Sequence, residues 1–294
     1  MKIRVPATSA NLGPGFDSLG LALDLHNEIT IKEANFLSIS IHGEGSNRPG
    51  IKTNNQFVNI FYNFYTKLVG RRDDFRFEFH NNIPFSRGLG SSSAVIISAI
   101  AAAYEMAGLK MSKESIVDKA LFYESHPDNI APAAHGGFTA SMAIKNDHVY
   151  TQKKKIPSYL KAVMVIPNKS MSTAKSRAKM SKSISMQKAV FNLTHTAVLT
   201  AAFFNEDWSV LRVASEDKMH QNIRMNGMRE LYKVQKTALL NGALMSTLSG
   251  SGSSFFNMVY EDDAAHLEKK LKEEFGKFRV EVFNFDNNGY LIEK

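Results

Sequence analysis

The chain has 294 residues, of which 44% are hydrophobic and 22% charged, as in globular proteins with a sizeable core. It has no cysteine, which excludes a disulfide framework and thiolate metal sites and agrees with a reducing, cytoplasmic location. The net charge of +8 permits nucleic-acid binding, but the basic residues are mostly dispersed and no nucleic-acid motif accompanies them. The most apolar stretch, residues 94–109, is too short to span a membrane, and the N-terminal sequence is not that of a signal peptide. We therefore expect a cytoplasmic protein without nucleic-acid or membrane partners.

Periodic patterns in the first half predict both strands and helices. In residues 75–80 three phenylalanines alternate with polar residues, which is typical of a half-buried strand. Ser112 is a suitable N-cap for a helix that follows it. The same analysis predicts strands at residues 28–32, 37–42 and 75–80, and helices at residues 55–69, 92–107 and 113–124.

The second half contains fewer strands and more helices. The patterns predict strands at residues 161–166, 255–260 and 279–285, and helices at residues 186–205, 208–220, 225–241 and 262–275. Because no regular alternation of strand and helix runs through the chain, the fold class is α+β. The polar stretch 146–158, with its run of three lysines from Lys153, is the best boundary, and we expect the lysines to lie in a solvated loop. It predicts an N-terminal domain at residues 1–152 and a C-terminal domain at residues 153–294, the latter compatible with a ferredoxin-like layer.

A glycine- and serine-rich segment, residues 84–94, leads directly into the predicted helix at 92–107. The start of a helix presents unpaired N–H groups at the positive end of its dipole, which suits phosphate. Gly88 and Gly90 allow the backbone to approach an anion closely, and the three serines from Ser91 add hydroxyls for phosphate or Mg²⁺. A serine-capped helix after a flexible turn is the simpler alternative. The segment lacks the lysine of a Walker A loop.

Two further segments accompany this loop. Residues 6–17 read Pro-Ala-Thr-Ser-Ala-Asn-Leu-Gly-Pro-Gly-Phe-Asp, and residues 248–254 read Leu-Ser-Gly-Ser-Gly-Ser-Ser. The three segments, in this order, resemble the GHMP kinase superfamily, and the first resembles homoserine kinases in particular. The resemblance covers about residues 3–260. It implies a two-domain α+β fold with the active site in the cleft between the halves, and the third segment packed beside the phosphate loop.

The resemblance also implies the reaction, in which ATP with Mg²⁺ phosphorylates the side-chain hydroxyl of L-homoserine for threonine synthesis. Phosphoryl transfer needs a phosphate cradle, a bridging cation and a positioned hydroxyl. The cradle is expected from Pro84, Phe85, Ser86, Arg87, Gly88, Leu89, Gly90, Ser91, Ser92, Ser93 and Ala94. Ser91, Ser92 and Glu124 are the expected ligands of Mg²⁺, although Asp128 could replace Glu124, whose spacing from His126 is short.

The acceptor site is expected from residues in three segments. By resemblance, His126 and Asn129 face the substrate and Asn129 lies close to the phosphorylated hydroxyl, where it orients the hydroxyl without acting as a strong base. Asp17 suits the ammonium group of an amino acid, and two arginines suit its carboxylate. The expected substrate contacts are Asn11, Asp17, His126, Asn129, Thr173, Arg177 and Arg224, with Asn129, Asp17 and His126 as the catalytic set.

Each of these residues also has a simpler interpretation. Asn11 could be a turn residue, Asp17 an N-cap and each arginine a surface residue, while residues 126–129 could form a polar turn at a helix end. The functional alternatives are another small-alcohol kinase of the superfamily, such as a mevalonate-type kinase, and a non-catalytic protein that keeps the fold. A homodimer is also compatible with the sequence.

Overall fold

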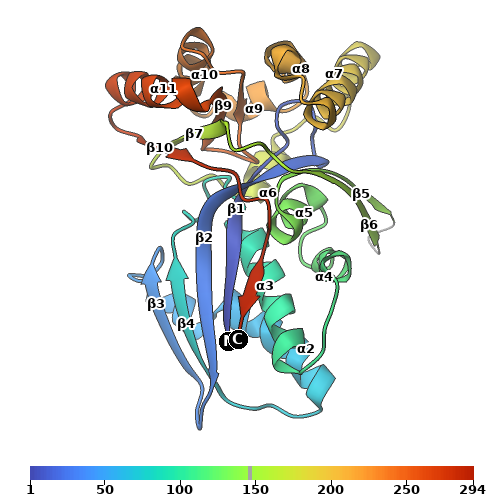
Figure 1. The fold of residues 1–294 in the computed structure, drawn as a ribbon, viewed down its shortest axis with the longest axis vertical. Coiled ribbons are helices and arrows are strands. Elements are labelled where there is room, and N and C mark those ends of the chain that lie inside the picture. Colours follow the sequence, from blue (N-terminus) through green and yellow to red (C-terminus); the bar gives the residue numbers. More distant parts are fainter. Residues whose placement is uncertain (145–147) are drawn as a thin grey trace.

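The computed structural model describes residues 1–144 and 148–294 and contains two β-sheets, one above the other in Figure 1. In the larger, lower sheet the strands follow the order β11-β1-β2-β4-β3, and β5 and β6 extend it beyond β2. β3 and β4 are parallel, whereas the other pairs are antiparallel. The strands are β1 (Lys2–Ala10), β2 (Leu19–Glu33), β3 (Ser38–Gly43), β4 (Phe75–Asn81), β5 (Phe138–Ile144), β6 (His148–Lys154) and β11 (Leu291–Glu293).

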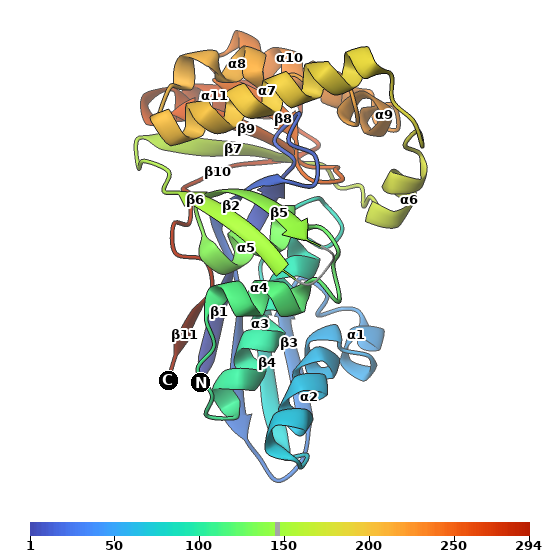
Figure 2. The same ribbon diagram turned by 90° about the vertical axis from the view of Figure 1, so that its right-hand side faces the viewer.

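Helices cover one face of the larger sheet (Figure 2). They are α1 (Pro49–Thr53), α2 (Gln56–Val69), α3 (Ser91–Met106), α4 (Lys113–Ala120) and α5 (Pro127–His135). The alternation predicted in β4 is present: Phe75, Phe77 and Phe79 are buried and pack edge-on against Phe57 or Phe61 of α2. α3 is almost entirely apolar because it is buried between the sheet and its neighbouring helices.

The smaller sheet is antiparallel, with the order β10-β7-β9-β8. Its strands are β7 (Leu160–Ile166), β8 (Met245–Leu248), β9 (Phe255–Tyr260) and β10 (Arg279–Phe283). Helices lie above it in Figure 1: α7 (Met186–Asn205), α8 (Leu211–Ala214), α9 (Gln221–Met225), α10 (Glu230–Leu240) and α11 (Glu261–Glu274), while α6 (Thr173–Ala178) lies lower, towards the larger sheet. This strand order and the helix between β9 and β10 agree with the predicted ferredoxin-like layer.

Two local predictions are wrong. The helix expected at residues 208–220 is a 3₁₀ turn (Trp208–Val210) followed by α8, which ends at Ala214. It ends because the carboxylate of Asp217 accepts hydrogen bonds from the N–H groups of Met219, His220 and Gln221, which form a separate turn before α9. The lysines from Lys153 do not form a loop either, since β6 includes Lys153 and Lys154.

The predicted division between residues 152 and 153 stays a prediction. The point falls within β6, which pairs with β5 in the larger sheet, and the smaller sheet begins only at β7. Part of the predicted boundary stretch, residues 146 and 147, lies outside the described residues. After β10 the chain returns to the larger sheet, where β11 pairs with β1 and places the two termini side by side (Figure 1).

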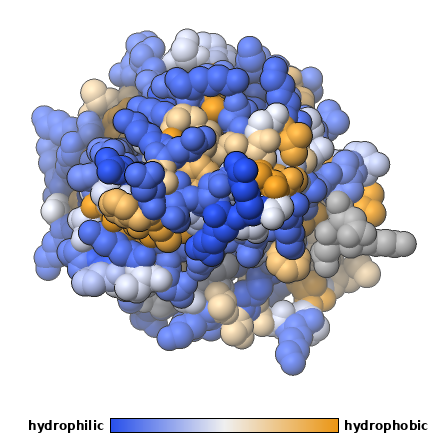
Figure 3. Space-filling view, turned by 90° about the horizontal axis from the view of Figure 1, so that it is seen from below, coloured by the Kyte–Doolittle hydropathy of each residue, from blue (hydrophilic) through white to orange (hydrophobic). Residues whose placement is uncertain are grey.

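The surface is predominantly hydrophilic on the face seen from below, with apolar residues in small separate groups (Figure 3). Among the described residues, no helix has both the length and the apolar character needed to cross a bilayer.

Candidate active site

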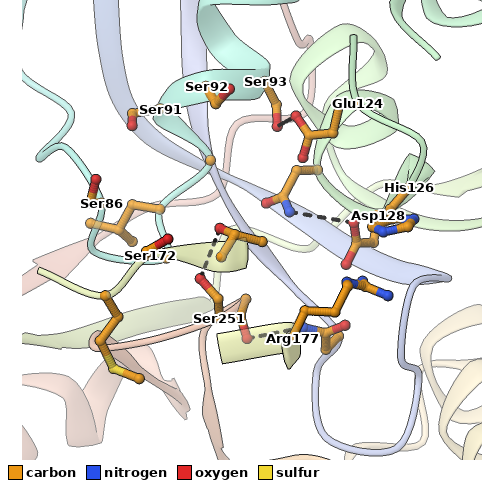
Figure 4. A pocket seen from close by; sticks show the side chains of 18 of the residues that line it. Ser86, Ser91, Ser92, Ser93, Glu124, His126, Asp128, Ser172, Arg177 and Ser251 are labelled. Carbon is orange, nitrogen blue, oxygen red and sulfur yellow. Dashed lines mark hydrogen bonds between the residues drawn. The ribbon is translucent and has the colours of Figure 1, made fainter. Parts of the chain in front are cut away.

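A cavity of about 360 Å³ lies between the two halves, lined by segments from both (Figure 4). Pro84, Phe85, Arg87 and Ala94 do not line it. The predicted site residues that do are Asn11, Asp17, Ser86, Gly88, Leu89, Gly90, Ser91, Ser92, Ser93, Glu124, His126, Asn129, Thr173, Arg177 and Arg224. The fold therefore gathers residues that are more than 200 positions apart in the chain into one cavity.

The glycine-rich loop ends at Gly90, the N-cap of α3, which has a φ of 65°. No serine side chain caps the helix, so the alternative of a serine-capped helix is wrong and the hydroxyls are available for other partners. A Cβ on Gly90 would collide with Oγ1 of Thr8 rather than fill the space of the cavity. Gly88 has a φ of 75°, and a Cβ there would collide with the carbonyl oxygen of Ser249. Close packing against neighbouring segments thus explains both glycines.

The carboxylate of Glu124 lies at the start of α3. Oγ of Ser93 donates a hydrogen bond of 2.7 Å to its Oε2 (Figure 4). Burial raises the pKa of Glu124, and the hydrogen bond from Ser93 acts in the opposite direction. Ser91 and Ser92 line the same part of the cavity, so two further hydroxyls lie near a carboxylate with restricted solvent access.

His126, Asp128 and Asn129 lie at the start of a helix, α5, and not at the end of one as the sequence suggested. Oδ1 of Asn129 accepts a hydrogen bond of 2.7 Å from Oγ1 of Thr8, which fixes the orientation of the amide. Nδ1 of His126 is 3.9 Å from Oδ2 of Asp17. Asp128 is buried, and burial, followed by the negative charges of Asp17 and Glu124, raises its pKa to about 8.

Asp17 and Arg177 form a bidentate ion pair. Nη1 and Nη2 of Arg177 donate to the two carboxylate oxygens of Asp17 over 3.0 and 2.6 Å. Asn11 holds the Asp17 segment in place, since its Oδ1 accepts from the N–H of Asp17 and its Nδ2 donates to the carbonyl of Gly250. A contact between Asn11 and substrate stays a prediction, because both of its amide atoms already have partners.

Arg224 is buried, with 4% of its surface exposed, and its guanidinium faces the cavity. Nη1 of Arg224 donates to the carbonyl of Gly250 over 2.9 Å and to Nδ1 of His220 over 3.3 Å. Nε2 of His220 donates to the carbonyl of Gly13, so His220 joins Arg224 to the first segment. The ring of Phe16 lies about 5 Å from the guanidinium carbons of both Arg177 and Arg224.

Burial dominates the titration of this region. Burial, followed by the positive charge of Arg177, lowers the pKa of Arg224 to about 10. Burial lowers the pKa of His220 to about 4, so His220 is neutral at neutral pH and its Nδ1 can accept from Arg224. Two arginines thus share a small volume with the carboxylate of Asp17, and the cavity presents both signs of charge to a ligand.

The third segment, between β8 and β9, packs against the glycine-rich loop, as the resemblance implied. Oγ of Ser249 donates to the carbonyl of Gly88 over 2.6 Å, and the N–H of Ser254 donates to the carbonyl of Arg87. Ser253 is buried and donates to the carbonyl of Lys169. Oγ of Ser251 lies 3.2 Å from Oγ1 of Thr173, the first residue of α6, at the cavity wall.

Sequence reasoning missed three residues that organise the cavity: Thr8, His220 and Ser251. Thr8 stands inside the first segment, two residues after Pro6, but a threonine within a strand carries no functional signal. His220 precedes Arg224 by one helical turn, and this spacing could have indicated that the two side chains are in contact. Ser251 is a member of a serine-rich segment whose hydroxyls the sequence does not distinguish.

Comparison with known proteins agrees with this geometry. The GHMP kinases N terminal domain matches residues 55–137, and the GHMP kinases C terminal domain matches residues 199–277. The chain is 58% identical over 294 residues to a homoserine kinase of a Nitratiruptor species, with 100% of each chain covered. The chain belongs to the homoserine kinase family of GHMP kinases. A homoserine kinase of Campylobacter jejuni is likewise 58% identical over 292 residues, 99% of this chain and 100% of the relative.

Solved structures give the same result. The crystal structure of homoserine kinase from Cytophaga hutchinsonii matches with a TM-score of 0.87 and 25% identity, covering 100% of this chain and 97% of the other. The crystal structure of L. major mevalonate kinase shares the fold with a TM-score of 0.75 but only 15% identity, covering 98% of this chain and 96% of the other. The predicted family, fold and kinase activity are confirmed, and the homoserine kinase interpretation is favoured over the mevalonate-type alternative.

Proposed function

We propose that the protein transfers the γ-phosphoryl group of ATP to the side-chain hydroxyl of L-homoserine, giving O-phospho-L-homoserine for threonine biosynthesis. The observation that carries this proposal is the charge pattern of one cavity. One end of the cavity, which we call the loop end, consists of Ser86–Ser93 and Glu124 and presents a carboxylate and hydroxyls at the start of α3. Asp17, Arg177 and Arg224 form its charged end. The phosphates of a nucleotide suit the loop end, and a zwitterionic amino acid suits the charged end.

The charged end would recognise the amino-acid backbone. Arg177 and Arg224 suit a carboxylate, and Asp17 suits an ammonium group. Because Arg177 and Asp17 are paired with each other, a zwitterion would replace that pair by offering each residue an opposite charge. His126 and Thr173 line the neighbouring wall and complete the proposed contacts.

Asn129 would orient the acceptor hydroxyl. Thr8 holds its Oδ1, and its Nδ2 donates a long hydrogen bond of 3.4 Å to Oδ1 of Asp128, which a substrate hydroxyl would share or replace. Asp128 lies next to it with a pKa of about 8, so at neutral pH it is protonated and adds no negative charge where the phosphates must approach. Catalysis would then depend on positioning and on stabilisation of charge rather than on a strong general base.

The loop end would hold the phosphates and Mg²⁺. Ser91, Ser92 and Glu124 supply hard oxygen donors, which suit Mg²⁺, and the N–H groups at the start of α3 suit phosphate oxygens. When bound, Mg²⁺ neutralises negative charge on the phosphates. A second hollow, lined by residues 43–48, Arg87 and Asn168, adjoins the same loop and is our proposed position for the nucleoside.

A coupled assay of ATP consumption tests the proposal. We expect turnover with L-homoserine, and none with mevalonate or without an acceptor. Turnover with mevalonate alone would favour the mevalonate-type alternative, and no turnover with any small alcohol would favour a non-catalytic member of the fold.

We also propose a homodimer in the cytoplasm. Apolar side chains on the outer face of α7, Met186, Val190 and Leu193, are exposed and follow helical spacing. Light scattering coupled to size exclusion measures the mass in solution, and a monomeric mass at micromolar concentration would contradict the dimer.

A further inference from the structure

The outer face of the larger sheet carries a cluster of metal-binding residue types, none of which lines the cavity. Glu78 and His80 lie two residues apart on β4, so their side chains project from the same face. His42 on β3 is the partner of His80 in the parallel register. The helices cover the opposite face of this sheet (Figure 2). The three side chains are about half exposed.

The three ligand atoms are already close together. Oε1 of Glu78 lies 3.2 Å from Nε2 of His80 and 3.7 Å from Nε2 of His42, and all three atoms lie within 4.8 Å of one another. A tetrahedral zinc ion about 2.0–2.2 Å from each donor places neighbouring donors about 3.3–3.5 Å apart. Small side-chain rotations therefore suffice to surround an ion. The imidazole rings are stacked, with centroids 4.7 Å apart and an angle of 16° between their planes.

A further carboxylate lies beside the cluster. Glu28 on β2 is the antiparallel partner of His80, so His42, His80 and Glu28 form one row across three strands. Glu28 is held in an ion pair with Lys2, at 2.7 Å. Arg76 is the next outward residue of β4, beyond Glu78, and is the nearest cation on that strand. The site thus offers three protein ligands, with the remaining position for water or for Glu28.

We propose that His42, Glu78 and His80 bind one divalent transition-metal ion of the zinc class. Two imidazoles and a carboxylate suit zinc, nickel or copper, whereas Mg²⁺ prefers oxygen ligands only. The site is therefore distinct in chemistry from the proposed Mg²⁺ site at Glu124. The chain contains no cysteine that would compete for such an ion.

The other such cluster among the residues that the structure describes, Asp24, His26 and Asp286, is less suited to a metal. Nε2 of His26 is 2.7 Å from Oδ2 of Asp286, and Oδ1 of Asp286 accepts from the N–H groups of Asn288 and Gly289. Its ligand atoms are thus occupied by a hydrogen-bond network that holds the segment before β11.

The metal would join the edge strand of the sheet to its neighbour. β3 forms the edge, and His42 directly precedes the segment 43–48 that lines the hollow proposed for the nucleoside. An ion held between β3 and β4 binds the folded state and therefore stabilises it by mass action. Protons compete with the metal for the imidazole nitrogens, so binding weakens as the pH falls.

Calorimetry with Zn²⁺, on chelator-treated protein without nucleotide, tests the proposal. We expect one Zn²⁺ per chain and a higher melting temperature that returns to its starting value with a chelator. His42→Ala and His80→Ala should each weaken binding at least tenfold, while His266→Ala, an exposed histidine on α11, should not. Circular dichroism checks that the variants are folded. Absence of saturable binding, or equal binding by His42→Ala, His80→Ala and the unaltered chain, would overturn the proposal.

Discussion

The loop end of the cavity is built mainly from backbone, and the charged end is built from side chains. At the loop end, Gly88 and Gly90 adopt positive φ and pack against Ser249 and Thr8, so the shape depends on the absence of a Cβ. At the charged end, Asp17 and Arg177 are already paired, and a ligand must exchange partners with them. The shape of the first end is therefore sensitive to volume, whereas its carboxylate, Glu124, and the second end are sensitive to charge. Substitutions of each kind test this difference.

The largest effect is expected from Gly90→Val. Valine at a φ of 65° is strained, and its Cβ would collide with Thr8, which also holds Asn129. We expect loss of nucleotide binding and of turnover, together with a lower melting temperature. Gly70→Val is the matched control, because Gly70 has a φ of 77° but no heavy atom within 4 Å of the added Cβ. Equal losses of nucleotide binding and turnover in the two variants would show that backbone strain alone, without the collision with Thr8, accounts for them.

Glu124→Gln should lower kcat by about 100-fold or more, because the amide lacks the charge that Mg²⁺ requires. Part of the loss should be recovered at high Mg²⁺, since the serines and phosphates remain. Homoserine binding should persist. Asp128→Asn is the control: if that variant, and not Glu124→Gln, changes the Mg²⁺ dependence of the rate, Asp128 holds the metal.

Arg177→Met and Arg224→Met should raise the KM for homoserine by about 10- to 100-fold, which corresponds to about 1.5–3 kcal/mol for a charge-assisted contact. The KM for ATP should be nearly unchanged, because both residues lie at the charged end. Arg279→Met, which removes an exposed pair with Glu281 on β10, should leave both constants unaltered. Normal homoserine binding by both cavity variants would refute the assignment of the amino-acid pocket.

His220→Gln should change how stability depends on pH. Burial lowers the pKa of His220 from 6.5 to about 4, so the unfolded chain binds this proton more tightly than the folded protein. The neutral imidazole therefore stabilises the fold above pH 6.5, and that contribution, on the order of 3 kcal/mol, is lost as the pH falls towards 4. Urea unfolding from pH 7 to 4 should show a smaller decline for the variant. An identical decline would mean that His220 does not titrate in this range.

The smallest effect is expected from Ser93→Ala. The Ser93 hydroxyl lowers the pKa of Glu124, so its removal raises that pKa further. We expect the acidic limb of the pH–rate profile to move to higher pH and kcat at neutral pH to fall by less than about tenfold. Ser98→Ala, whose hydroxyl bonds only to the backbone of α3, provides the comparison. A profile unchanged in both variants would show that Ser93 does not influence the ionisation of Glu124.

The sequence predicted the elements that depend on local periodicity. The strand at β4 and the helices α2, α3 and α7 were found within a few residues, because apolar spacing alone defines them. The strands β1, β5, β6, β8 and β11 were not predicted. Their residues form strands because partners distant in the chain pair with them, as β11 does with β1, and such pairing has no local signal.

Within the site, the sequence identified the residues but not their contacts. The three segments contained Asp17 and the serines, and the stretch 124–129 contained Glu124 and Asn129. Arg177 and Arg224 followed from the resemblance. The pairing of Arg177 with Asp17 and the contact between Thr8 and Asn129 depend on how β1, α5 and α6 meet, which the sequence alone does not define. The same holds for burial, which determines the titration of Asp128 and His220.

The pairing of β11 with β1 has a consequence for biosynthesis. Lys2 and Ile3 pair with Glu293 and Ile292, so β1 is synthesised long before the strand with which it pairs. The smaller sheet, from β7 to β10, lies wholly between them and can form earlier. We therefore expect the larger sheet to be completed only once β11 has been synthesised, with one edge of β1 open to other chains until then.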